Sequence, residues 1–439
     1  MGPMNLRVHE IRRRGARLAF VLAIISGAQL AAPAACRAQL NYVARFTVEK
    51  ESFLLGEPIF CDFKIQNTGT RMFSFSYRSP SRALNRELEQ EPRFTVTSKA
   101  GGDIPDPAAR PCGGVQGSVV YGSASLPPGQ THTERWLLNQ WAAVTKPGRY
   151  RVRAERRLPL FSGEVLGEQT GERPAAYAVA LSELTFDVLP ASGAQLEEVF
   201  RHVLKTLDQG TGAALAESVL VVTTLPQPFL LERLETMASA PAGEQRWDRR
   251  QALDGLARLG TPEAWETISK IATGRLPPSQ SSSRPVDISL RAYAVLLLAE
   301  KGDTRFLPPL LELVSTSPAE LRGDVLRALG LFRDPRANQV LFERLHSGSA
   351  LDRQNAILGL KELESRDVVP ALLAMLQDPE PQVRQVAHFA LESLTGMKFK
   401  LPSRASRQDS ARVSAEWHAW WREKGANFTP LHQPPCHDW

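Results

Sequence analysis

The sequence lacks the local motifs that mark common catalytic sites. Its 439 residues contain no glycine-rich phosphate loop, no H-E-x-x-H, no G-x-S-x-G and no Cys-x-x-Cys. The histidines are scattered, and acidic pairs such as Glu197-Glu198 occur where a solvated helix surface is expected. A site assembled from distant residues would leave no local motif, so this absence weakens an enzyme hypothesis without excluding it. We predict a noncatalytic protein with no cofactor and no metal site.

An excess of positive charge is also missing outside the first residues. The formal net charge is +6, but six of the 53 basic residues and one of the 47 acidic residues lie in residues 1–38. The rest of the chain therefore carries 47 basic and 46 acidic residues. Because phosphate binding requires a basic surface, the sequence predicts no nucleic-acid partner.

Long apolar runs are absent except at the front of the chain. Arg12, Arg13, Arg14 and Arg17 precede an apolar stretch over residues 18–35, and small residues follow at Cys36 and Ala38. This order is typical of a secretory signal peptide over residues 1–38, with an uncleaved membrane anchor as the alternative. We predict export to the periplasm or the exterior, and no membrane span after cleavage.

Cysteines are few, and three of the four follow the predicted cleavage site: Cys61, Cys112 and Cys436. An oxidising compartment permits one disulfide among them. Cys61 and Cys112 fall in the same predicted domain and form the favoured pair, although spacing alone leaves the connectivity open.

Residues 39–190 show the two-residue apolar period of β-strands. Ile59, Cys61, Phe63 and Ile65 alternate with more polar positions, and similar short alternations recur up to residue 190. Proline- and glycine-containing turns separate them. The pattern predicts an all-β sandwich of seven or more strands, with long connections over residues 103–114 and 156–176.

The sequence of this region resembles that of bacterial immunoglobulin-like modules. The residues that carry the resemblance are Leu54-Leu55-Gly56-Glu57-Pro58, Leu126-Pro127-Pro128-Gly129-Gln130 and Pro147-Gly148-Arg149-Tyr150-Arg151-Val152. The resemblance implies an immunoglobulin-like β-sandwich that serves as an adhesive or spacer module.

Residues 191–424 contain an internal repeat with helical periodicity. Its marker is an arginine that recurs every 31 residues, followed by a small residue three positions later and a leucine seven positions later: Arg291, Arg322, Arg353 and Arg384. Arg249 opens an earlier frame, 42 residues before Arg291, with the excess in the Pro- and Ser-rich residues 274–285. A sustained period of this length predicts an α-solenoid of stacked helical pairs, with residues 425–439 as a tail.

The repeats resemble HEAT repeats, especially the short HEAT-like form of phycobilisome-lyase-type proteins. The resemblance rests on Asp352-Arg353-x-x-Ala356-x-x-x-Leu360 and on Asp378-Pro379-Glu380-Pro381-Gln382-Val383-Arg384-x-x-Ala387. It implies an armadillo-like helical fold that binds proteins. It does not imply a reaction, and an export signal argues against the intracellular lyase chemistry.

Two features of the array have both a structural and a ligand-binding interpretation. The recurring arginines could grip an anionic ligand, but Asp303 and Asp334 also recur 31 residues apart, so we predict a structural ladder between adjacent units. Trp417, Trp420 and Trp421 share one helix face, which predicts a cap on the last repeat, with a sugar-binding platform as the alternative.

These patterns together favour a noncatalytic protein-binding scaffold or adaptor of the cell envelope or exterior, with the solenoid as the interaction surface. The alternative is a lyase-like HEAT protein or a carbohydrate-binding accessory module. The sequence does not identify the partner, the solenoid face that binds it or the oligomeric state.

Overall fold

The protein is described by a computed structural model at residues 40–78, 91–99, 101–107, 121–163, 173–240, 247–275, 287–402 and 405–431. The chain divides into two units, Met1–Gln39 and Leu40–Trp439, and every element below belongs to the second unit. The predicted signal peptide, Cys112 and Cys436 lie outside the described residues.

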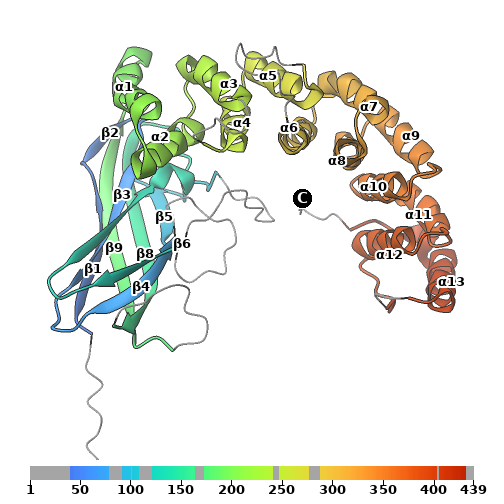
Figure 1. The fold of residues 1–439 in the computed structure, drawn as a ribbon, viewed down its shortest axis with the longest axis horizontal. Helices are drawn as coiled ribbons and strands as arrows, with labels where there is room; N and C mark the ends of the chain where they lie inside the picture. Colours follow the sequence, from blue (N-terminus) through green and yellow to red (C-terminus); the bar gives the residue numbers. More distant parts are fainter. Residues whose placement is uncertain are drawn as a thin grey trace, which may run out of the picture. The chain divides into compact units, whose positions relative to one another are not determined.

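The first elements of the chain are β-strands arranged in two sheets (Figure 1). One sheet has the order β1-β3-β7; the other has the order β2-β9-β8-β4-β6, with β5 also paired to β8. The strands are β1 Tyr42–Val48, β2 Ser52–Leu54, β3 Phe60–Asn67, β4 Phe73–Arg78, β5 Arg93–Ser98, β6 Tyr121–Leu126, β7 Thr131–Leu137, β8 Gly148–Ser162 and β9 Ala176–Leu189.

Both sheets contribute to one hydrophobic core, as the two-residue alternation predicts. In the first sheet, Cys61 and Phe63 of β3 lie opposite Trp136 and Glu134 of β7 and are fully buried. Tyr150 and Val152 of β8 face the same core from the second sheet. Each strand therefore buries one of its two faces, which explains its apolar alternation.

Two features of the β domain differ from the sequence prediction. Strand β8 continues through the segment expected to begin a long connection, and it pairs with β9 from Gly148↔Val188 to Leu160↔Ala176. The reason is that Leu158 and Leu160 keep the inward parity of Val152 and are fully buried. In addition, β2 pairs with β9 in parallel, so the domain is not wholly antiparallel.

The remainder of the described chain is helical. Its α-helices are α1 Gly193–Gln209, α2 Gly212–Thr224, α3 Leu231–Ser239, α4 Arg249–Leu259, α5 Pro262–Thr273, α6 Ile288–Lys301, α7 Leu307–Thr316, α8 Ala319–Leu329, α9 Pro335–Arg344, α10 Ala350–Lys361, α11 Val369–Met375, α12 Pro381–Thr395 and α13 Arg407–Lys424. Successive pairs follow a curved path, with α4, α6, α8, α10 and α12 on its inner side (Figure 1). We call these the inner helices, and α5, α7, α9 and α11 the outer helices.

Polar N-caps and close helix crossings set the repeat geometry. The side chains of Asp248, Asp287 and Ser349 accept backbone N–H bonds at the starts of α4, α6 and α10. Gly330 and Gly359 lie where α8 and α10 approach: a Cβ at Gly359 would stand 2.4 Å from the Leu326 carbonyl oxygen. Only glycine allows the two inner helices this separation.

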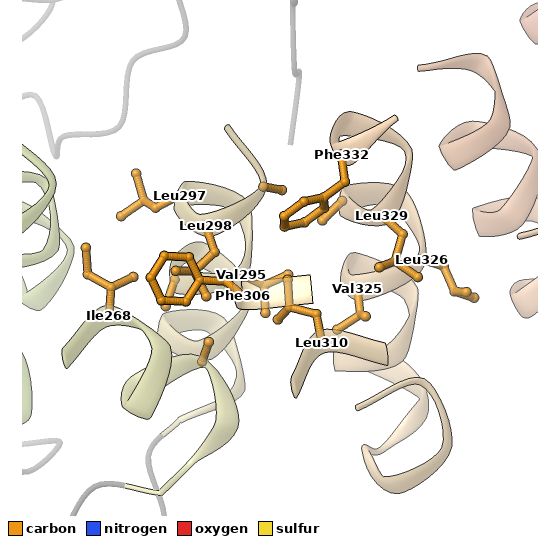
Figure 2. Close-up of a cluster of buried hydrophobic side chains, with 14 of the residues drawn as sticks. Ile268, Val295, Leu297, Leu298, Phe306, Leu310, Val325, Leu326, Leu329 and Phe332 are labelled. Atoms are coloured by element: carbon orange, nitrogen blue, oxygen red, sulfur yellow. The ribbon is translucent and has the colours of Figure 1, made fainter. Parts of the chain in front are cut away.

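The helical core is continuous from one repeat to the next. Figure 2 shows Leu310 of α7 between Val295 of α6 and Val325 of α8, and Phe306, from the turn before α7, on the side of Val295 toward Ile268 of α5. All five side chains are buried. Each pair thus completes its core with its neighbours, as expected of a solenoid. None of the helices in the described ranges has the length and apolar character needed to cross a bilayer.

Candidate interaction surface

The inner helices present one face that turns away from the outer helices. We call it the inner face and define it by the positions two before and two, five and nine after each repeated arginine, a spacing that lies on one side of a helix. Its members are Ser289, Tyr293, Leu296 and Glu300 on α6; Glu320, Asp324 and Arg327 on α8, with Leu331 just after it; Leu351, Asn355 and Leu358 on α10, with Glu362 just after it; and Gln382, Val386, Phe389 and Ser393 on α12.

The inner face is apolar toward the end of the array. Phe389 on α12 is 53% exposed and Leu351 on α10 is 46% exposed, while Leu358 and Val386 are partly exposed. The Lys361 ammonium lies 5.9 Å from the centre of the Phe389 ring. These residues expose large apolar groups on two consecutive repeats.

The earlier inner helices carry a polar network instead. The Tyr293 hydroxyl on α6 donates to the Asp254 carboxylate on α4, and the Arg250 guanidinium lies 5.7 Å from the Tyr293 ring centre. On α8, Arg327 is paired with Asp324 one turn earlier. The polar pairs thus lie on the earlier inner helices, whereas the most exposed large apolar side chains of the inner face lie on α10 and α12.

The repeated arginines lie between helical pairs and donate hydrogen bonds to the segment that precedes each inner helix. Each donates to backbone oxygens there: Arg249 to Ala240, Arg291 to Ala272, Arg322 to Ser317, Arg353 to Ser347 and Gly348, and Arg384 to Asp378 and Pro379. Arg249, Arg353 and Arg384 are less than 10% exposed. The arginines therefore satisfy carbonyl groups that the end of an outer helix or the following turn leaves free.

Four of these arginines also reach forward to the next unit. Arg249 pairs with Asp287, and Arg322 Nε lies 3.0 Å from Asp352. Arg353 grips Asp378 through two bonds of 2.7 and 2.9 Å, and Arg384 donates to Ser410 of α13. The arginines thus link consecutive units by charge-assisted and neutral hydrogen bonds.

The predicted acidic partners of this ladder were wrong. Asp303 and Asp334 do not meet the repeated arginines; each caps the segment that follows it and pairs with the arginine two residues later, Arg305 or Arg336. The side-chain hydrogen bonds from Arg305 and Arg336 hold the pKa values of Asp303 and Asp334 below their ordinary range. The N-cap position engages these carboxylates locally, so the ladder uses the acids at the starts of the inner helices instead.

The three predicted cap tryptophans differ in burial. Trp417 is fully buried and packs edge-on against Phe399, with ring centres 4.6 Å apart. Trp420 and Trp421 are partly exposed and both contact the Phe428 ring. The three rings therefore do not form one exposed platform.

A groove of about 730 Å³ separates α5 from the α7 segment on the outer layer. Glu263, Glu266 and Lys270 line its α5 side, and Arg275 bridges to Glu312 across 2.8 Å. Both walls carry acidic and basic groups, so the groove favours no ligand of one charge.

The β domain holds a buried ion pair between its two sheets. Glu134 Oε1 of β7 lies 2.9 Å from Arg156 Nη1 of β8 and 3.4 Å from His132 Nε2. The Arg156 guanidinium, 2% exposed, lies 4.4 Å from the centre of the Phe63 ring. Such burial is typical of an internal structural pair rather than of a solvent-accessible catalytic base.

Cys112, the predicted disulfide partner, falls outside the described residues, and Cys61 is a core residue of the β domain. Its thiol is free and fully buried on β3, opposite Trp136. Burial raises the pKa of the Cys61 thiol to about 12, with a smaller contribution from Asp62. Because its side chain lies on the inward-facing side of β3, Cys61 serves as a small core residue.

Part of the helical region matches a family model of known repeats. The family model for HEAT repeats matches residues 283–351 and 338–402. The chain is similar to the CpcE and CpcF complex of phycocyanin lyase from Nostoc sp. (15% identity, 42% of this chain and 74% of that chain, TM-score 0.28). It is also similar to computationally designed armadillo repeat proteins for modular peptide recognition (14%, 46% and 94%, 0.26) and to human deoxyhypusine hydroxylase (18%, 45% and 90%, 0.22). A search of curated proteins gives no match.

The chain thus combines a β domain with an α-solenoid that contains HEAT repeats. Sequence analysis missed two features of its surfaces and core. Phe389 and Leu351 were not identified as exposed, although their positions in the 31-residue frame place them opposite the buried leucines. The sequence prediction places Arg156 in a connection, but counting by two from Val152 places it on the inward face of β8. In both cases the periodicity already contained the signal.

Proposed function

We propose that this protein is a noncatalytic scaffold whose HEAT repeats bind a protein partner on the inner face. Repeat solenoids commonly offer an extended inner surface to proteins, and this chain supplies such a surface from four consecutive inner helices, α6, α8, α10 and α12. The polar pairs on the earlier helices and the exposed apolar side chains on α10 and α12 would give a partner both orientation and buried area.

The exposure of Leu351 and Phe389 carries this proposal. A half-exposed leucine or phenylalanine is ordinary when it stands alone. Here the two occur on neighbouring repeats of the same face, with Leu358 and Val386 beside them. Burial of such side chains releases about 25 cal/mol per Å² of apolar area, so a partner seated there gains affinity from them.

Site-specific photo-crosslinking tests the surface. A photoreactive phenylalanine analogue replaces Phe389 in the full chain, which is incubated with envelope and secreted fractions of the source cells. We expect crosslinks to one partner, and we expect Leu351→Glu to reduce their yield at least tenfold. The matched control carries the same analogue at Leu181, which is 58% exposed on β9. Equal yields from both positions, or an unchanged yield with Leu351→Glu, would refute binding on the inner face.

We further propose that the scaffold acts in the periplasm or outside the cell, because residues 1–38 have the order of a secretory signal. The mass of the mature protein tests this separately. We expect a chain that begins at Gln39 in the exported fraction; a full-length chain confined to the cytoplasm would contradict export.

A further inference from the structure

The last repeat and helix α13 meet at a buried histidine. Trp417 of α13 donates its indole N–H to Nδ1 of His388 on α12, over 2.9 Å. The Trp417 side chain is fully buried, and His388 is 7% exposed. This bond is the polar centre of an otherwise aromatic contact that includes Phe399.

The direction of this hydrogen bond fixes the protonation state of the histidine. An indole nitrogen can only donate, so Nδ1 must carry a lone pair and the imidazole must be uncharged. Its proton then sits on Nε2, which lies 3.5 Å from the Glu392 carboxylate. A second proton on Nδ1 would face the indole N–H, and Trp417 would lose its acceptor inside the core.

The charged groups around His388 act in opposing directions. Glu392 on α12 and Glu416 on α13 favour a charged imidazole, while Lys398 in the following segment opposes it. A hydrogen bond to the Phe399 backbone also favours the charged ring. Burial outweighs this bond and the two carboxylates and lowers the pKa of His388 below its ordinary value of 6.5. The neutral ring is therefore favoured while α13 is attached.

We propose that His388 is a pH-sensitive latch for α13: the uncharged ring holds the helix on the last repeat, and protonation releases it. The sign follows from linkage, because the detached chain binds the extra proton more readily than the attached one. Attachment is strongest above pH 6.5 and weakens as the pH falls below that value.

Release of α13 would be a local event at the end of the array. Among the described residues, Gln377 donates to Ser414 over 2.8 Å, Arg384 donates to Ser410 over 3.2 Å, and Arg412 of α13 donates to the Lys400 carbonyl over 2.9 Å. The Arg366 guanidinium also lies 5.6 Å from the centre of the Trp421 ring. Terminal elements of repeat proteins contact a single neighbour and open before the rest. Detachment would expose the fully buried Trp417 and the Phe399 ring that it packs against, as a new apolar surface at acid pH.

Hydrogen exchange of the full chain tests the latch. Exchange of peptides from residues 407–424 is measured at pH 7.5 and 5.5 and corrected for the intrinsic rate. We expect the protection of α13 to fall about five- to tenfold at pH 5.5, with no change in α6–α8. His388→Gln retains an acceptor but cannot be charged, so its protection should be the same at both pH values. His418→Gln, on the exposed side of α13, is the matched control and should keep the loss.

Three results would overturn the latch. They are pH-independent protection in the wild type, a loss that persists in His388→Gln, and a loss that disappears in His418→Gln. If His388→Gln does not fold, NMR titration of the histidines in the wild-type chain decides the question. We expect His388 to titrate below 6.5 from a neutral form protonated at Nε2, and titration at or above 6.5 would contradict the proposal.

Discussion

The β domain and the repeat array both bury arginine, but they satisfy it differently. In the β domain, Arg156 crosses the core to Glu134 on the opposite sheet and lies over the Phe63 ring. In the array, Arg353 meets Asp378 through two bonds and also donates to two backbone carbonyls. The array arginine therefore completes helix ends that every repeat must close, while the β-domain arginine compensates one carboxylate at one place.

Removal of the β-domain arginine should have the largest effect. Arg156→Met leaves the Glu134 carboxylate, with a side chain 7% exposed, without its cation inside the core. We expect the β domain to lose about 3–5 kcal/mol of stability, the usual effect of breaking a buried ion pair on one side. Denaturant unfolding followed by hydrogen exchange of β7 and β8 peptides measures this loss.

The control for that measurement replaces both members of the ion pair by apolar residues. The double variant Arg156→Met with Glu134→Leu removes both charges and should recover most of the lost stability, because neither group is then desolvated without a partner. A double variant as unstable as the single one would mean that Arg156 acts through packing rather than charge.

Removal of one ladder arginine should have a smaller and more local effect. Arg353→Met deprives Asp378 of its two arginine bonds, but the Asp378 carboxylate still accepts a backbone N–H from Glu380 over 2.9 Å. We expect about 2–3 kcal/mol of lost stability in α10–α12, measured by hydrogen exchange in those helices, and little change in the β domain.

Substitution of an exposed arginine in the same repeats shows whether the effect of Arg353→Met comes from the buried ladder or from arginine–aspartate pairing in general. Arg305 pairs with Asp303 in solvent, so Arg305→Met should leave the stability of the array unchanged within error. If Arg305→Met and Arg353→Met reduced the stability of the array equally, burial would not determine how much an arginine–aspartate pair contributes to that stability.

The sequence predicted the architecture because both halves have a regular period. Alternation by two identified the strands, and the 31-residue recurrence from Arg291 to Arg384 identified stacked helical pairs. The same regularity misled the prediction for Asp303 and Asp334, because equal spacing does not distinguish an N-cap from an inter-repeat partner. That choice depends on which backbone N–H groups lie nearest in the folded turn.

Less of the candidate site than of the fold could be predicted from the sequence. The repeat frame shows that Phe389 and Leu351 share a face, but whether the face is covered depends on curvature and on the elements around it. The pairing of Arg156 with Glu134 likewise requires the stacking of two sheets, since their strands, β8 and β7, belong to different sheets. Long-range juxtaposition of this kind leaves no spacing signal.

The thiol of Cys61 reports the opening of the β domain without any substitution in the core, and it therefore distinguishes the stability of the β domain from that of the repeats. With a pKa of about 12 and a fully buried side chain, Cys61 should stay unmodified by iodoacetamide at pH 8 while the β domain is folded. Its alkylation, measured at the peptide level, then follows the opening of that domain alone. We expect Arg156→Met to accelerate Cys61 alkylation about 100-fold or more and Arg353→Met to leave it unchanged. Equal acceleration by both variants would show that the β domain and the repeats open as one cooperative unit.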